Sequence, residues 1–263
     1  MAKAGREFIH LILDRFSLKG KSALITGSSR GLGAAIAVAF AEAGANVAVH
    51  GSSSAPTATQ QKLQAVGVKS AALVGDVGDA AVCARLVEET VQHFGSIDIL
   101  VNNAGIIRRS PAADHSEEDW KAVIDVDLTS VFRLTQHAGR HMLNRGSGKI
   151  INIASLLTFQ GGILVPSYAA AKGGVGQLTK AFANEWAAKG VNVNAIAPGY
   201  MDTDNTEALR NNPERARQIL ERIPAGRWGK PEDLAGAAVF LASSASDYLH
   251  GHVLVVDGGW LNR

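Results

Sequence analysis

The chain has 263 residues, of which 46% are hydrophobic and 19% charged, and 26 Lys and Arg against 24 Asp and Glu give a formal net charge of +2. This composition excludes a disordered chain, because the hydrophobic fraction is high and the net charge small. It argues against a nucleic-acid binder, since no long Lys/Arg block occurs. No apolar run approaches the roughly 20 residues that a membrane-spanning helix needs, so we expect no membrane partner.

The single cysteine, Cys83, excludes an internal disulfide framework and suits a reducing cytoplasm. Near the N-terminus, the apolar stretch at 8–13 is short and interrupted by His10, which makes a poor signal peptide. We therefore expect a cytoplasmic protein with a peripheral N-terminal extension at 1–16.

Short apolar runs alternate with longer segments of helical periodicity along the rest of the chain. Runs that are apolar throughout indicate strands buried on both faces, and their alternation with helices predicts right-handed crossovers. Residues 17–263 are therefore predicted to form one α/β domain, a doubly wound, Rossmann-type parallel sheet of about seven strands with helices on both faces. The strands are expected near 21–26, 46–50, 69–74, 97–101, 149–154, 191–196 and 253–256. Residues 198–231 lack this alternation and are predicted to be an irregular lid.

A glycine-rich loop, TGSSRGLG at 26–33, follows the first predicted strand and opens the first long helix. Binding a dinucleotide pyrophosphate needs a tight turn, a close backbone approach and a helix N-terminus aimed at the negative charge. Any turn between strand and helix can use glycine, but the strand before and the helix after favour a dinucleotide site. The predicted contacts from this loop are Gly27, Ser29, Arg30, Gly31, Leu32 and Gly33.

The end of the second strand distinguishes NAD from NADP, because a carboxylate there binds the ribose 2′-hydroxyl and repels a 2′-phosphate. Residues 49–54 read VHGSSS and contain no acid. Arg30 and Ser52 are candidate partners of a phosphate, with a solvated arginine beside a flexible serine loop as the alternative. The sequence therefore favours NADP and leaves NAD open.

Two further strand ends carry candidate cofactor contacts, because the ligand of an open parallel sheet lies across the carboxyl ends of its strands. Asp76 is a candidate acceptor for an adenine amino group, or else a turn-forming aspartate. The contacts predicted at these two ends are Asp76, Val77, Asn103, Ala104 and Gly105.

Tyr168 and Lys172 are four residues apart in a helix predicted to begin after Pro166, so they share one helix face. Ser155 follows the fifth strand, at a carboxyl end of the sheet. A nearby lysine ammonium favours tyrosine phenolate, and a serine hydroxyl can hold a substrate oxygen. Together the three side chains can exchange a proton with a carbonyl or hydroxyl oxygen. Tyr-x-x-x-Lys alone is typical of a helix surface, so the hypothesis depends on the combination.

These motifs, with NNAG at 102–105 and Ala197-Pro198-Gly199, resemble the short-chain dehydrogenase/reductase family over roughly residues 17–263. The resemblance implies a nicotinamide cofactor, a homotetramer and a site in which Tyr168 is the general acid/base. It also implies cofactor contacts from Tyr168, Lys172, Asn103, Ala104, Pro198, Gly199 and, through the carboxamide, Thr203.

A narrower resemblance, to the 2-deoxy-D-gluconate 3-dehydrogenases (also called 2-dehydro-3-deoxy-D-gluconate 5-dehydrogenases), is carried by NNAGIIRR, IINIASLLTFQGG, NVNAIAPGYM, RIPAGRWGKPEDL and VVDGGWLNR. It implies an oxidoreductase that transfers a hydride between the cofactor and a keto or hydroxy group of a small sugar acid. The alternatives within the family are a gluconate 5-dehydrogenase and a 3-oxoacyl-acyl-carrier-protein reductase. The net charge of +2 gives little support to the second, which would need a basic face for its carrier protein. The alternative outside enzymes is an NADP-binding sensor with weak activity.

Two residues depart from the pattern of that subgroup. Its members are generally NAD-linked, whereas this glycine loop contains Arg30. Asp127 stands where the family usually has an Asn that helps to hold a water beside the lysine. We count Asp127 among the candidate catalytic residues, with a helix-internal backbone contact as the alternative.

On the substrate side, Arg108 and Arg109 come shortly after NNAG and could bind a sugar-acid carboxylate, or else form a solvated basic loop. Gln160 follows Ser155 by a short loop and could face substrate hydroxyls. No metal is expected, because His137 and His141 have no carboxylate partner of a hydrolytic zinc motif.

Overall fold

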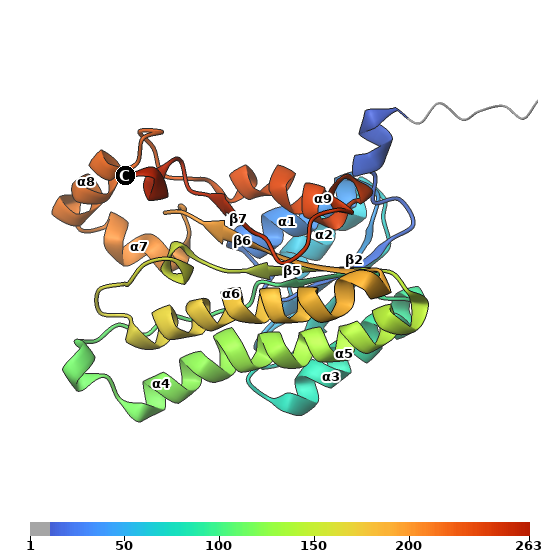
Figure 1. Ribbon diagram of the computed structural model, residues 1–263, viewed down its shortest axis with the longest axis horizontal. Helices are drawn as coiled ribbons and strands as arrows, with labels where there is room; N and C mark the ends of the chain where they lie inside the picture. Colours follow the sequence, from blue (N-terminus) through green and yellow to red (C-terminus); the bar gives the residue numbers. More distant parts are fainter. Residues whose placement is uncertain (1–10) are drawn as a thin grey trace, which may run out of the picture.

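The computed structural model describes residues 11–263 and contains one sheet of seven strands in the order β3-β2-β1-β4-β5-β6-β7 (Figure 1). Every neighbouring pair is parallel, which confirms the predicted doubly wound sheet. β1, β4 and β6 are buried along their whole length because helices cover both faces. The strands are β1 (Ser22–Ile25), β2 (Asn46–Gly51), β3 (Ser70–Val74), β4 (Ile99–Asn102), β5 (Gly148–Ile153), β6 (Val191–Pro198) and β7 (Val253–Val256).

The helices form one layer on each side of the sheet (Figure 1). One layer holds α1 (Gly31–Glu42), α2 (Thr57–Val66) and α9 (Ala235–Ala242), and the other holds α3 (Ala80–Phe94), α4 (Glu117–Ile124), α5 (Ser130–Arg145) and α6 (Pro166–Trp186). Two buried clusters fill the space between the layers. Ile36 and Phe40 of α1 belong to the first, and Leu86 of α3 and Leu134 of α5 to the second.

The prediction of an irregular segment at 198–231 is wrong over much of its length. The segment contains α7 (Asp204–Arg210) and α8 (Pro213–Arg222), and Asn212 caps α8 by accepting a hydrogen bond from the Arg215 amide. Helices of seven and ten residues are too short for their periodicity to stand out in a polar sequence. Ile219 and Ile223 pack with Leu156 and Trp260 in a small cluster of their own, so the two helices are anchored separately from the main core.

Residues 1–10 of the predicted extension lie outside the described residues, and Ile12–Phe16 form a short 3-10 helix. This helix contacts the end of α9. Arg15 donates to the Ser244 carbonyl, and the Ser244 hydroxyl donates to the Arg15 carbonyl. In the part of the chain from 11 to 263, no helix combines the length and the apolar character needed to cross a bilayer.

Candidate active site

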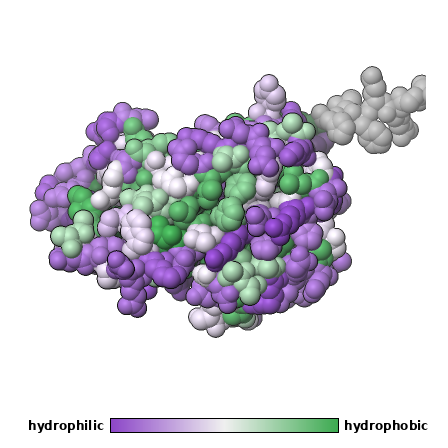
Figure 2. All heavy atoms as spheres, turned by 60° about the horizontal axis from the view of Figure 1, so that its bottom comes forward, coloured by the Kyte–Doolittle hydropathy of each residue, from purple (hydrophilic) through white to green (hydrophobic). Residues whose placement is uncertain are grey.

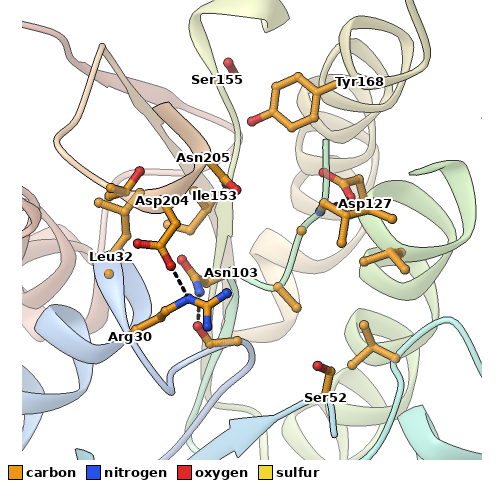
Figure 3. Close-up of a pocket in the computed structure, with 18 of the residues that line it drawn as sticks. Arg30, Leu32, Ser52, Asn103, Asp127, Ile153, Ser155, Tyr168, Asp204 and Asn205 are labelled. Atoms are coloured by element: carbon orange, nitrogen blue, oxygen red, sulfur yellow. Dashed lines mark hydrogen bonds and ion pairs between the residues drawn. The ribbon is translucent and has the colours of Figure 1, made fainter. Parts of the chain in front are cut away.

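A pocket of about 820 Å³ lies at the carboxyl ends of the strands, where a doubly wound sheet binds its ligands (Figure 3). Loops that follow β1, β2, β3, β4, β5 and β6 all contribute to its wall. Every predicted cofactor residue lines it except Gly33, and the four predicted catalytic residues line it as well. Its size suits a dinucleotide together with a small substrate.

The glycine loop brings the backbone close to the neighbouring loop after β4. Gly27 has φ +62°, and a Cβ there would lie 2.8 Å from Ala104 Cα. A Cβ on Gly33 would lie 2.5 Å from the Asn103 side-chain nitrogen, which donates to the carbonyls of Thr26 and Gly27. The absence of a side chain at Gly33 therefore lets Asn103 come close enough to bind the glycine loop, although Gly33 itself does not line the pocket.

The N-terminus of α1 is free to receive an anion. Its N-cap residue, Arg30, has an extended backbone and makes no side-chain capping hydrogen bond. The first amides of the helix therefore have no side-chain partner there, and they carry the partial positive charge of the helix end. This arrangement fits the pyrophosphate of a dinucleotide.

His50, at the end of β2, is a pocket residue that the sequence interpretation missed. Its Nδ1 accepts from the Gly27 amide at 3.0 Å, and its Nε2 donates to the Gly75 carbonyl at 2.8 Å. Burial lowers the pKa of His50, so the ring is held neutral in this tautomer. The side chain joins the glycine loop to the end of β3. Its partners lie 23 and 25 residues away, and a lone histidine in an apolar strand gives no signal of them.

Arg30 and Ser52 lie toward the end of the pocket opposite Ser155 (Figure 3). The exposed Arg30 side chain forms an ion pair with Asp204 at 2.6 Å, between Nε and Oδ2. Asp204 is the first residue of α7 and was not predicted. Asp76 Oδ1 accepts a hydrogen bond from the Gly78 amide, as expected of a turn-forming aspartate. Asp76 also lines the pocket.

Ser155 and Tyr168 lie at the other end of the pocket (Figure 3). Lys172 also lines this end, beside the Tyr168 ring. Lys172 Nζ donates to the Ile153 carbonyl at 2.9 Å and lies 5.4 Å from the Tyr168 ring centre. Desolvation raises the pKa of Tyr168. The Lys172 charge and a hydrogen bond with Ser155 lower this pKa, but desolvation is the larger effect and the pKa is raised overall. The phenol is therefore protonated at neutral pH and lies beside a serine hydroxyl that can hold a substrate oxygen.

Asp127 lies in a π-helical turn, Asp125–Thr129, between α4 and α5, and its side chain is 0% exposed. Oδ1 accepts from the Ile106 amide at 2.8 Å. Oδ2 has no hydrogen-bond partner among residues 11–263 and lies 3.6 Å from Lys172 Nζ. Desolvation raises the pKa of Asp127, although Lys172 opposes this shift. The geometry is that of a carboxylate directed at Lys172 rather than away from it.

None of the three predicted substrate residues lines the pocket. Arg108 pairs with Asp119 at 3.3 Å, and Gln160 accepts from the Trp260 indole at 3.4 Å. Arg109 donates to the Asn205 carbonyl at 2.8 Å, and its charge helps to lower the pKa of Tyr168. Arg109 is therefore the better placed of the two arginines to meet a substrate.

The structure brings no metal ligands together among the residues it describes, 11–263. His141, one of the two histidines spaced by four, instead lies 2.9 Å from Glu88.

Comparison with known proteins places the chain among nicotinamide-dependent enzymes. It matches the sequence family described as "Enoyl-(Acyl carrier protein) reductase" over residues 27–261. The 2-dehydro-3-deoxy-D-gluconate 5-dehydrogenase of Bacillus subtilis is 55% identical over 250 residues, which are 95% of this chain and 98% of the relative.

Two solved structures are similar over nearly their whole length. One is a candidate 2-deoxy-D-gluconate 3-dehydrogenase from Agrobacterium tumefaciens with bound NADP, which is 54% identical, has a TM-score of 0.89 and covers 95% of this chain and 100% of its own. The other is a gluconate 5-dehydrogenase from Burkholderia cenocepacia in complex with NADP and tartrate. It is 42% identical, has a TM-score of 0.91 and covers 95% of this chain and 99% of its own.

Proposed function

Because the chain belongs to the short-chain dehydrogenase/reductase family, we propose that it interconverts a ketone and a secondary alcohol on a small sugar acid with a nicotinamide cofactor. The observation that carries this proposal is the meeting of Ser155, Tyr168 and Lys172 at one end of a pocket whose other end has an uncapped helix N-terminus. A sensor without chemistry would not need a tyrosine and a lysine held together in this way.

A nicotinamide held in this pocket would supply or accept the hydride. In ketone reduction, the Tyr168 hydroxyl gives its proton to the substrate oxygen, and in alcohol oxidation the phenolate takes that proton back. Lys172 stabilises the phenolate through its positive charge, and Ser155 holds the substrate oxygen near the tyrosine. The glycine loop and the start of α1 would hold the pyrophosphate, so pyrophosphate binding and proton transfer belong to different residues.

Tyr168→Phe tests this division of roles. Turnover should fall by about 10² to 10⁴, the usual loss for one acid/base group, while NADPH affinity measured by fluorescence titration stays nearly unchanged. A Phe variant that retains turnover would remove Tyr168 from the chemistry.

We propose NADP as the preferred cofactor. Arg30 can pair with a 2′-phosphate, and Ser52, Ser53 and Ser54 add hydroxyls without any carboxylate. Arg30→Ala should therefore weaken NADPH binding more than NADH binding. Equal losses, or tighter NADH binding by the wild-type protein, would contradict the preference.

The proposed substrate class is a keto or hydroxy aldonic acid of the 2-deoxy-D-gluconate type, which the names of the relatives support. The gluconate 5-dehydrogenase activity of the Burkholderia relative makes gluconate-type acids the second candidate. Steady-state assays with 2-dehydro-3-deoxy-D-gluconate, 5-ketogluconate and neutral diketones would rank them. Turnover confined to the neutral diketones would exclude the sugar-acid class.

We further propose a cytoplasmic homotetramer. The lone cysteine, Cys83, is buried and forms no disulfide within the chain, which is compatible with a reducing compartment. Trp120 on α4 and Phe132 on α5 are 45% and 41% exposed, and Figure 2, which turns this side of the molecule forward, shows apolar surface in its middle. Apolar surface of this kind favours contact between subunits. Light scattering after size-exclusion chromatography tests the tetramer, and a monomer at micromolar concentration would refute it.

A further inference from the structure

Arg30 and Lys172 are the arginine and lysine side chains among the described residues that line the pocket, and Lys172 belongs to the catalytic end. His50 also lines the pocket, but burial lowers its pKa and keeps the ring neutral. The carboxylates in the wall are more numerous: Asp76, Asp125, Asp127 and Asp204. Asp125 is paired with Lys121, which is not in the wall. A cofactor with several phosphate charges would therefore meet one exposed cation, Arg30, at its adenosine end, and this cation is already paired with Asp204 (Figure 3).

The partner of Arg30 belongs to the first turn of α7. Residues 203–205 are held from two sides, because Arg30 of the glycine loop binds Asp204 and Arg109, from the loop after β4, binds the Asn205 carbonyl. The two segments are close even without the ion pair, since a Cβ on Gly31 would lie 3.7 Å from the Thr203 methyl group. Breaking the Arg30 pair would remove the ion pair that joins the start of α7 to the glycine loop, while Arg109 would still hold Asn205.

We propose that Asp204 and the 2′-phosphate of NADP compete for Arg30, so that NADP frees the start of α7 from the glycine loop whereas NAD leaves it tethered. This inference rests on the proposed role of Arg30 in NADP binding. The Arg30 and Asp204 side chains are 77% and 67% exposed, and exposed pairs are weak enough to exchange partners. A phosphate binds the guanidinium fork through charge-assisted, bidentate hydrogen bonds. By competing for Arg30, Asp204 then weakens the preference of the protein for NADP over NAD.

Asp204→Asn removes the competitor and keeps a residue of similar shape at the start of α7. We expect NADPH to bind roughly two- to fivefold tighter, the equivalent of a weak exposed ion pair, and NADH affinity to stay unchanged. Glu207→Gln is the matched control, because it removes one exposed carboxylate from the same helix. Its titrations with both cofactors should match those of the wild type.

A double-mutant cycle identifies Arg30 as the cause. In an Arg30→Ala background, Asp204→Asn should no longer favour NADPH over NADH. Equal tightening of both cofactors would mean that Asp204 acts only through general charge, and weaker NADPH binding would mean that Asp204 and the phosphate share Arg30. Either result overturns the competition. If Arg30→Ala weakens NADPH and NADH alike, the NADP role of Arg30 itself is wrong, which is a different failure.

Hydrogen exchange tests the release of α7 directly. Amides of residues 204–210 should exchange faster in the NADPH complex than in the NADH complex of the wild-type protein, and the Asp204→Asn variant should show no such difference. Equal protection in the two wild-type complexes would refute the release.

Discussion

Asp127→Asn changes the charge beside Lys172 without changing the size of the side chain. Lys172 Nζ is 3.6 Å from Asp127 Oδ2 and 5.4 Å from the Tyr168 ring centre, so the carboxylate lies within about 9 Å of the ring. At an effective dielectric constant of about 20, two negative charges at that distance repel by about 1.8 kcal/mol. This corresponds to about 1.3 pKa units, or roughly a twentyfold change in a proton equilibrium. Asp127 accordingly contributes to raising the pKa of Tyr168.

The expected result follows from the form of Tyr168 that each reaction direction uses. Alcohol oxidation needs the phenolate, so the rise of its pH–rate profile should move down by about 1.3 pH units in the Asn variant, with up to roughly twentyfold faster oxidation near neutral pH. Ketone reduction uses the protonated phenol, so its rate at pH 7 should change little. The groups titrate together, and the profiles report macroscopic values.

The measurement is kcat against pH in both directions for the wild type, Asp127→Asn and Asp114→Asn. Asp114 is exposed, so its variant controls for the loss of one negative charge elsewhere on the protein. Wild-type and Asp127→Asn profiles that superimpose in the oxidation direction would refute the electrostatic reasoning. An equal shift of the oxidation profile in the Asp114→Asn variant would show that the effect does not depend on the position of the charge.

Two other side chains give further tests. Arg109→Met should raise KM for sugar acids and spare neutral ketones, since a hydrogen bond to a carboxylate contributes about 1.5–3 kcal/mol. An equal loss for acids and neutral ketones would make Arg109 structural. His50→Ala should raise KM for NADPH with little change in kcat, because the Gly27 amide and the Gly75 carbonyl lose their partner. Because burial lowers the pKa of His50, its contribution to folding stability is present above its ordinary value of 6.5 and is lost as the pH falls below it. Thermal denaturation between pH 5 and 8 checks this direction, with the exposed His93→Ala as control.

The sequence predicted the strands and the glycine loop because each depends on local pattern. A strand covered on both faces is apolar throughout, and β1, β4 and β6 show this directly. The glycine loop follows from backbone requirements that only glycine meets, as the 2.5 Å approach at Gly33 illustrates. Tyr168 and Lys172 could be paired because helical spacing alone brings side chains four residues apart together.

The parts that sequence reasoning missed depend on contacts between distant segments. His50 acts through Gly27 and Gly75, and nothing near His50 in the sequence indicates either partner. Arg30 and Asp204 are 174 residues apart in the chain, and Asp204 lies in a region where the sequence predicts no helix. The π-helical turn at Asp125–Thr129 was likewise not anticipated, since it changes the direction of a side chain inside an otherwise continuous helical stretch.

Two aspartates in the same pocket wall show why burial, rather than residue type, determines what a carboxylate does. Asp127 is fully buried beside Lys172, where low polarity makes its charge act over several ångströms and alter a proton equilibrium. Asp204 is mostly exposed, where solvent screens its charge and leaves it a weak, exchangeable partner for Arg30. Substituting Asn should therefore change the pH dependence of catalysis at position 127 and the choice of cofactor at position 204. If either substitution produced both effects, the two ends of the pocket would be electrostatically coupled, and the separation of binding from proton transfer would fail.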